Sequence, residues 1–217
     1  MGAFAGMTEL LGDLVPVAAS LGYPDSSICV LKGNIDLLAA EFPQTHANLM
    51  SCGYHKDGRT PIEYGQDLVA SWIYEDSLMA ELTKKGLQIT GAGADKKREI
   101  LARANVTTES DCCVSSGNTS RKLEIMNDYK GYWSTMRKCH LRDEKYTRMT
   151  RENAIFLGVA PLDKKYFIAD FANPVEAKYI PYHRPYYGKP AYEISVSQDR
   201  LKELDFNTIA QEIATMF

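Results

Sequence analysis

The residues that could carry out chemistry in this chain gather between Asp111 and Lys130. Asp111 stands before an apolar pair of cysteines, and Glu124, Asp128 and Lys130 follow in a β-like run. Mg²⁺ prefers oxygen ligands and commonly uses one or two carboxylates together with substrate phosphate and water. A metal bound in this way activates water for attack on phosphorus, and a nearby lysine offsets negative charge. These residue types therefore suit hydrolysis of a phosphodiester.

Two neighbouring strands joined by a turn would bring these groups together. We expect strands over 112–116 and 121–128, with a turn over 115–118 between them. Because side chains alternate along a strand, the even-numbered residues from 122 to 128 share one face, and Leu123 and Ile125 point to the other. Burying Glu124 and Asp128 there would be costly without a metal or another cation. The alternative is an exposed hairpin with a solvated charged face.

Two places in the second strand and just after it could supply the acid-x-Lys triplet. Glu124 lies twelve intervening residues after Asp111, but Met126 stands where a lysine would complete an acid-x-Lys triplet. The literal triplet begins at Asp128 and ends at Lys130, with sixteen residues between Asp111 and Asp128. We expect Asp111 and Glu124 to be the metal ligands, and keep Asp128 as a further candidate.

This stretch resembles the PD-(D/E)xK nuclease superfamily, which includes many type II restriction endonucleases and repair nucleases. The resemblance covers roughly residues 63–171 and includes the order of the parts. A helix that carries an acid, Glu75 or Glu81, precedes the motif, a helix start over 140–146 follows it, and the strand AIFLGVA comes next. The proline of the family name is absent, because Ser110 precedes Asp111.

The resemblance implies a Mg²⁺-dependent DNA endonuclease, with Mn²⁺ as a substitute metal. In such a site Asp111 and Glu124 would hold the metal, Glu75 would contribute from the preceding helix, and Lys130 or Lys145 would supply the amine. It also implies double-stranded DNA as the partner and a homodimer, with the N-terminal helices as an interface. A restriction system and a phage or repair role both fit. The alternative is a catalytically inactive DNA-binding or interaction protein on the same fold, for which Met126 is the main evidence.

Several basic residues outside the motif are candidates for DNA contacts, because Lys and Arg side chains bind backbone phosphates. His183 and Arg184 could instead read base edges or stack on bases. Each group could also be ordinary surface, and the segment around His183 a plain loop. The candidates are Lys96, Lys97, Arg98, Arg142, Lys145, His183 and Arg184.

The hydrophobic pattern predicts helices over 8–21, 27–42, 61–86 and 199–217, and further strands over 87–90, 154–160 and 166–171. We expect a loop over 50–61, a short helix after the glycines at 91 and 93, a partly helical segment over 133–153, and strands flanking a Pro- and Gly-rich loop over 177–197. The predicted fold class is α/β, an α+β sandwich with a central mixed β-sheet flanked by helices, of the restriction-endonuclease type. An N-terminal helical segment, 1–60, would precede a nuclease-like core, 61–217, in one continuous domain.

Composition narrows the class of protein without naming its function. The chain has 217 residues, 45% hydrophobic, and a formal net charge of −3, so it does not have the charge of an overall basic nucleic-acid binder. A local basic groove can still coexist with an acidic remainder. Its five cysteines are irregularly spaced, which argues against a disulfide framework or a zinc site. The N-terminus fits neither a signal peptide nor a membrane span, so we expect a cytoplasmic protein with no membrane partner.

Overall fold

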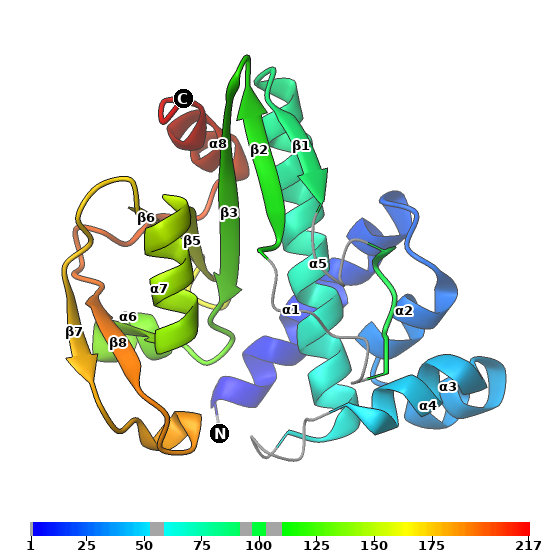
Figure 1. The fold of residues 1–217 in the computed structure, drawn as a ribbon. Coiled ribbons are helices and arrows are strands. Elements are labelled where there is room, and N and C mark those ends of the chain that lie inside the picture. The colour runs from blue at the N-terminus through cyan, green and yellow to red at the C-terminus, as the bar shows by residue number, and fades with distance from the viewer. Residues whose placement is uncertain (1, 53–58, 92–96, 103–109) are drawn as a thin grey trace. The chain divides into compact units, whose positions relative to one another are not determined.

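The computed structural model describes residues 2–52, 59–91, 97–102 and 110–217, and side-chain surroundings from residue 9 onward. The chain divides into two compact units (Figure 1). Unit 1 comprises Met1–Ala80 and Gly91–Glu109, and unit 2 comprises Glu81–Thr90 and Ser110–Phe217. The boundary predicted at residue 60 falls within unit 1.

The described part of unit 1 before residue 81 is mainly helical. The predicted N-terminal helix is confirmed, whereas the prediction of one helix over 27–42 is wrong. Two short helices occupy that range, because Gly33 adopts a φ of +72° and ends the first of them. A further helix over 43–51 was not predicted, and it begins with proline at its first turn. The helices are α1 (Gly2–Ser20), α2 (Asp25–Leu31), α3 (Ile35–Glu41) and α4 (Pro43–Ser51).

The long helix predicted over 61–86 is confirmed as α5 (Pro61–Lys84). A reciprocal cap starts it, because Thr60 Oγ1 accepts from the Glu63 N–H at 3.3 Å and the Glu63 carboxylate accepts from the Thr60 N–H at 2.7 Å. Gly86, with a φ of +81°, follows the last turn. The short helix predicted after Gly91 lies largely outside the described residues, and residues 98–102 are not helical.

Unit 2 is built on a mixed six-stranded sheet with the order β1-β2-β3-β5-β6-β9, in which β9 is the short strand Lys202–Glu203. β2 pairs antiparallel with β3, β3 parallel with β5, and β5 antiparallel with β6. Gly117, with a φ of +57°, lies in the tight turn that joins β2 to β3. The predicted strands are confirmed as β1 (Gln88–Gly91), β2 (Cys112–Ser116), β3 (Thr119–Asn127), β5 (Ile155–Ala160) and β6 (Lys165–Asp170).

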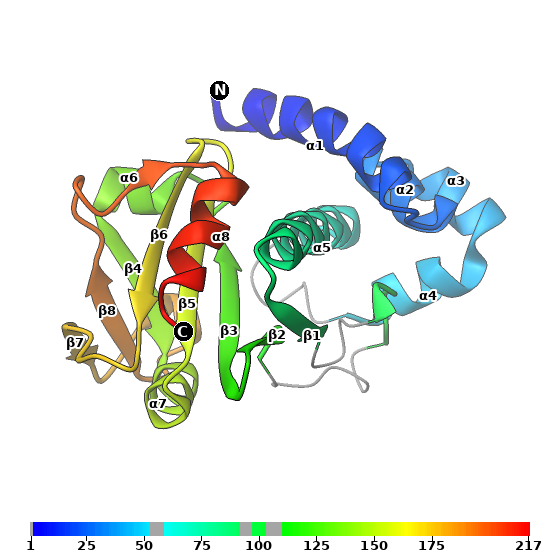
Figure 2. The ribbon, with the colours of Figure 1, turned by 90° about the horizontal axis from the view of Figure 1, so that it is seen from above.

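A second sheet of three strands, ordered β4-β8-β7, forms a neighbouring layer in unit 2 (Figure 2). Its strands are β4 (Lys138–Arg142), β7 (Ala177–Ile180) and β8 (Ala191–Ser195). β4 was not predicted, because it is only five residues long and lies in a charged segment between α6 (Tyr132–Met136) and α7 (Asp143–Glu152). α7 packs against β3, β4 and β8. The buried core of this region includes Leu141 of β4, Met149 of α7, Phe156 of β5, Phe167 of β6 and Ile194 of β8.

The C-terminal helix is shorter than predicted. Residues Lys202–Glu203 form the edge strand β9, and α8 spans Phe206–Ala214. Asp205 caps this helix by accepting from the Thr208 N–H at 3.0 Å. The Tyr166 hydroxyl of β6 donates to Glu212 of α8 at 2.6 Å, which fixes the helix to the larger sheet. No helix within the described ranges is both long and apolar enough to cross a lipid bilayer.

Candidate functional site

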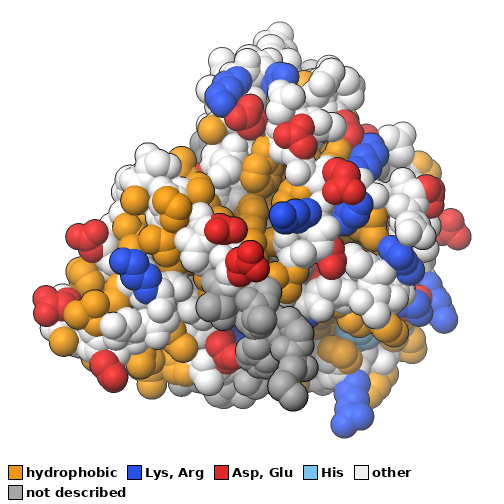
Figure 3. All heavy atoms as spheres, turned by 180° about the vertical axis from the view of Figure 1, so that it is seen from behind, with side chains coloured by type: hydrophobic (Ala, Val, Ile, Leu, Met, Phe, Trp, Pro, Cys, Tyr) orange, Lys and Arg blue, Asp and Glu red, His pale blue; other side chains and the backbone are white. Residues whose placement is uncertain are grey.

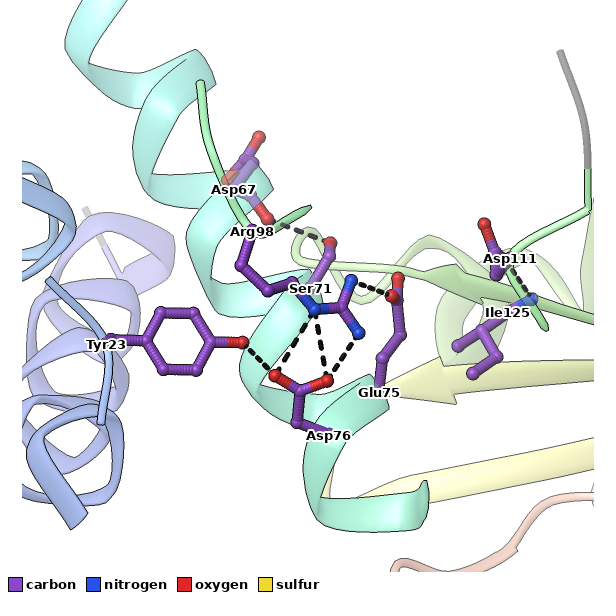
Figure 4. Close-up of polar contacts among 8 residues, drawn as sticks. All are labelled: Tyr23, Asp67, Ser71, Glu75, Asp76, Arg98, Asp111 and Ile125. Atoms are coloured by element: carbon purple, nitrogen blue, oxygen red, sulfur yellow. Dashed lines mark hydrogen bonds and ion pairs between the residues drawn. The ribbon is translucent and has the colours of Figure 1, made fainter. Parts of the chain in front are cut away.

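The hairpin of β2 and β3 brings Asp111 close to the backbone of the second strand. Cys112 pairs with Leu123, so continuing the register by one residue sets Asp111 opposite Glu124. Asp111 Oδ2 accepts a hydrogen bond from the Ile125 N–H at 2.6 Å (Figure 4). The first of the two predicted metal ligands is therefore held at the start of β2, beside the strand that carries the second.

Glu124 is a buried carboxylate neutralised by two cations. Its side chain is 6% exposed, and it points from β3 toward α7. Lys145 Nζ lies 2.6 Å from Glu124 Oε1, and an Arg148 guanidinium nitrogen lies 2.5 Å from Oε2. These ion pairs offset the free-energy cost of burying the Glu124 carboxylate, because buried charge is tolerated when it is paired and hydrogen-bonded. Lys145 and Arg148 are adjacent on α7 because three residues separate neighbours on one helix face.

Among the two lysines left open by the sequence, Lys145 is the one in contact with Glu124. Lys130 is exposed and follows the end of β3, where it lines a pocket described below. Met126 lies on the same face of β3 as Glu124, opposite Gly158 of β5. The lysine missing at position 126 thus has a counterpart on the following helix.

Asp128 organises the chain after β3. One carboxylate oxygen accepts from the Lys130 N–H at 3.0 Å, and the other accepts from the Trp133 N–H at 2.7 Å. Asp128 is 7% exposed, and its own N–H donates to Val159 O at 2.8 Å. Its contacts are those of a buried acid that holds the first turn of α6, and its role as a metal ligand stays a prediction.

Glu75 lies in unit 1, within a buried polar network (Figure 4). The Arg98 guanidinium contacts Glu75 at 2.7 Å and Asp76 at 2.5 Å, and the Tyr23 hydroxyl donates to Asp76 at 2.5 Å. Burial opposes the charge of Arg98, but its bonds to the two acids raise its pKa overall. Burial and the bond to Asp76 raise the pKa of Tyr23 as well. This network gives both Glu75 and Arg98 a structural role, and the catalytic role of Glu75 stays a prediction.

The remaining predicted site residues have different surroundings. Glu81 pairs with Lys84 at 2.5 Å near the end of α5. Lys96 lies outside the described residues, and Lys97 is exposed. Arg142 and Arg184 are exposed, and the Arg142 guanidinium lies 5.4 Å from the Tyr186 ring centroid. On the face drawn in Figure 3, basic and acidic side chains are interspersed among hydrophobic ones.

A pocket of about 570 Å³ opens in unit 2 beside Met126. Its walls come from the end of β3, the following loop, α6, β4 and the segment around the short 3₁₀ helix η4 (Arg184–Tyr186). They include Met126, Lys130, Tyr132, Trp133, Met136, His140, His183, Pro185 and Tyr186. The predicted site residues Asp128, Lys130 and His183 therefore line one hollow, whereas the sequence assigned them to separate roles.

Two histidines lie together in this pocket. Their ring centroids are 4.3 Å apart. His140 Nε2 lies 3.1 Å from Glu193 Oε2, and His140 Nδ1 lies 3.3 Å from the Tyr132 hydroxyl. Burial lowers the pKa of His183, and His140 lowers it further. Sequence reasoning missed His140, Tyr132 and Glu193. The pairing of β4 with β8 brings His140 to Glu193, and Tyr132 reaches His140 from α6, so no sequence spacing links the three.

No known family model matches this chain, and no curated protein matches it either. Among the described residues there is also no group of three or more His, Cys, Asp or Glu side chains arranged to hold a metal.

Proposed function

We propose that the protein is a metal-dependent DNA endonuclease of the restriction-endonuclease-like class. Asp111 and Glu124 would bind the metal, and Lys145 would supply the amine of the motif. The observation that carries the proposal is the 2.6 Å contact between Lys145 Nζ and Glu124 Oε1, on a hairpin in which Asp111 accepts from the N–H of the next residue, Ile125.

The order of the parts supports this assignment. A helix, α5, precedes the hairpin, α7 follows it, and β5 then returns parallel to β3. These are the parts, in the order, that the resemblance of the sequence implies. The helix α7 carries Lys145 and Arg148 over the polar side of β3, where a phosphodiester would need positive charge.

The carboxylates of Asp111 and Glu124 offer the hard oxygen donors that Mg²⁺ prefers, and Mg²⁺ sites often use only one or two carboxylates. Mn²⁺ suits the same oxygen donors. A bound metal would supply an activated water and stabilise charge on phosphorus. The chain's own residues position the groups around it: the Ile125 N–H orients Asp111, and Lys145 and Arg148 hold Glu124 and provide charge for a phosphate.

A plasmid-nicking assay with Mg²⁺ or Mn²⁺ tests this function. The parent should convert supercoiled double-stranded DNA to open circles, and Asp111→Asn and Glu124→Gln should each lose the activity. Asp163→Asn, an acid outside the proposed site, should keep it. Activity that survives both site substitutions would refute the assignment. Sedimentation with and without duplex DNA tests the homodimer that a two-fold target would require.

The second candidate is a DNA-binding or interaction protein that does not cut. Arg148 favours it, because both oxygens of Glu124 already contact cations and a metal would have to compete with one of them. This candidate predicts duplex binding without nicking in either metal, and the same binding by the parent and Asp111→Asn.

A further inference from the structure

We propose that the pocket beside Met126 binds a single nucleotide, with its base unstacked from its neighbours. The ligand class is a planar heteroaromatic ring that carries a phosphate. The choice of a nucleotide among planar ligands rests on the proposed function, whereas the pocket itself is defined independently of Glu124.

The size and lining of the pocket suit a flat ring. Its volume of about 570 Å³ lies within the usual range of small-molecule sites. Tyr132, His140 and Tyr186 contribute rings to its walls, and Met126 and Met136 contribute apolar surface. Tyr132 and Met136 are 37% and 50% exposed, so both present surface that a ligand could cover. Bases extruded from a nucleic acid bind between aromatic and apolar side chains in this way.

One buried polar atom in the pocket wall has no partner among the described residues. His183 is 8% exposed, and its Nδ1 makes no hydrogen bond within the part of the chain that the structure describes. A buried polar group left unsatisfied costs about 1–3 kcal/mol, so a ligand whose binding turned Nδ1 toward it would recover that cost. Burial and the neighbouring His140 lower the pKa of His183, which favours the neutral form of the ring. A neutral imidazole offers one donor and one acceptor, which suits the edge of a base.

Two exposed cations lie at or next to the pocket wall and could meet a phosphate. Lys130 is exposed and lines the pocket, and Arg184 is exposed next to His183. Tyr182 and Tyr187, on either side of this segment, are 71% and 60% exposed. Exposed tyrosines with nearby cations are the combination that single-stranded nucleic acids bind, through stacking and backbone charge. The surroundings of the pocket therefore favour a nucleotide over an uncharged aromatic molecule.

Calorimetric titration of the full chain with 2′-deoxynucleoside 5′-monophosphates, and with 2-deoxyribose 5-phosphate as a base-free probe, tests the pocket. At least one nucleotide should bind tenfold or more tightly than the sugar phosphate. Tyr132→Ala and His183→Phe should each weaken that binding at least fivefold. His46→Phe, the same change in α4 of unit 1, should bind as the parent does.

Equal binding of nucleotide and sugar phosphate would overturn the proposal, and so would parent-like binding by both pocket variants. If His183→Phe does not fold, Tyr132→Ala decides, because that side chain is partly exposed. The nicking assay separates this inference from the proposed function. Base-dependent binding without nicking would support the nucleotide pocket and refute the proposed nuclease activity. Nicking without base-dependent binding would refute only the nucleotide pocket.

Discussion

Lys145 Nζ on α7 lies 2.6 Å from Glu124 Oε1 on β3, so a lysine of the following helix meets the acid of the motif strand. Met126 occupies the strand position where a lysine would complete the triplet. If Lys145 on the helix supplies the amine that a strand lysine would supply at position 126, a lysine placed at position 126 should be able to replace Lys145 in catalysis.

That relationship predicts a rescue. Lys145→Met should lose nicking activity, and the double variant Lys145→Met/Met126→Lys should recover at least a tenth of the parent rate. Because Met126 lies on the same face of β3 as Glu124, a lysine there starts close to the acid. Initial nicking rates at a fixed Mg²⁺ concentration measure the effect. Lys145→Met/Lys130→Met is a control double variant that adds no amine near Glu124. If Lys145→Met/Met126→Lys folds but does not recover nicking activity, the proposed role of Lys145 is contradicted.

Glu124 should contribute to stability as well as to the site. Glu124→Gln leaves Lys145 and Arg148 without their shared counter-charge, and we expect a loss of roughly 2–3 kcal/mol in the free energy of unfolding, because both cations are partly exposed. Urea unfolding followed by circular dichroism measures it. Glu203→Gln removes a surface partner of Lys165 and should change stability by less than about 1 kcal/mol. Similar losses in the two variants would show that the ion pairs of Glu124 contribute no more to stability than a surface ion pair.

Gly158 is required by the packing of the larger sheet. An added Cβ would lie 2.3 Å from Phe167 Cε1, and Phe167 is 1% exposed and cannot move aside easily. Gly158→Ala should therefore lower the free energy of unfolding by at least about 1–3 kcal/mol. Gly12→Ala in α1 meets nothing within 4 Å and should be neutral or stabilising. A thermal melt of both variants checks the prediction, which a parent-like Gly158→Ala would contradict.

Asp170 should make stability fall in acid. Burial alone would raise its pKa, but hydrogen bonds from Arg121, from the Ala172 N–H and from Asn173 lower the pKa overall. The ordinary pKa is 3.8, so the stabilisation is present above that pH and is lost as the pH falls through the lower folded-state value. Unfolding midpoints of the parent should therefore drop more steeply below about pH 4 than those of Asp170→Asn. Parallel pH profiles would contradict the prediction.

The sequence was sufficient for the elements that have a strong local signal. The periodicity of α5, the alternation of β2 and β3, and the apolar run of β5 predicted those elements directly. β4 was missed because its five residues pair only with β8, far along the chain. The break at Gly33 was missed because the helical spacing continues across it, while the positive φ interrupts the backbone.

The candidate site was predictable only in part. Asp111 and Glu124 follow from spacing on a hairpin, and Lys145 was one of two lysines that the sequence left open. The pocket could not be predicted, because Met126, His140 and His183 come from three segments that tertiary packing brings together. Arg98 was expected on the surface, but its ion pairs with Glu75 and Asp76 depend on how residues 97–102 fold back onto α5.

The proposed site predicts that DNA cleavage depends on the Glu124–Lys145 pair together with Asp111 and a bound metal. The sharpest comparison is the nicking of supercoiled plasmid in Mg²⁺ by the parent, by Lys145→Ala and by Lys165→Ala, since Lys165 forms a surface ion pair outside the site. We expect a fall of roughly a hundredfold or more for Lys145→Ala, the scale of losing one electrostatic catalytic group, and no change for Lys165→Ala. A parent that does not nick DNA in Mg²⁺ or Mn²⁺, or a folded Lys145→Ala that nicks at the parent rate, would contradict the claim.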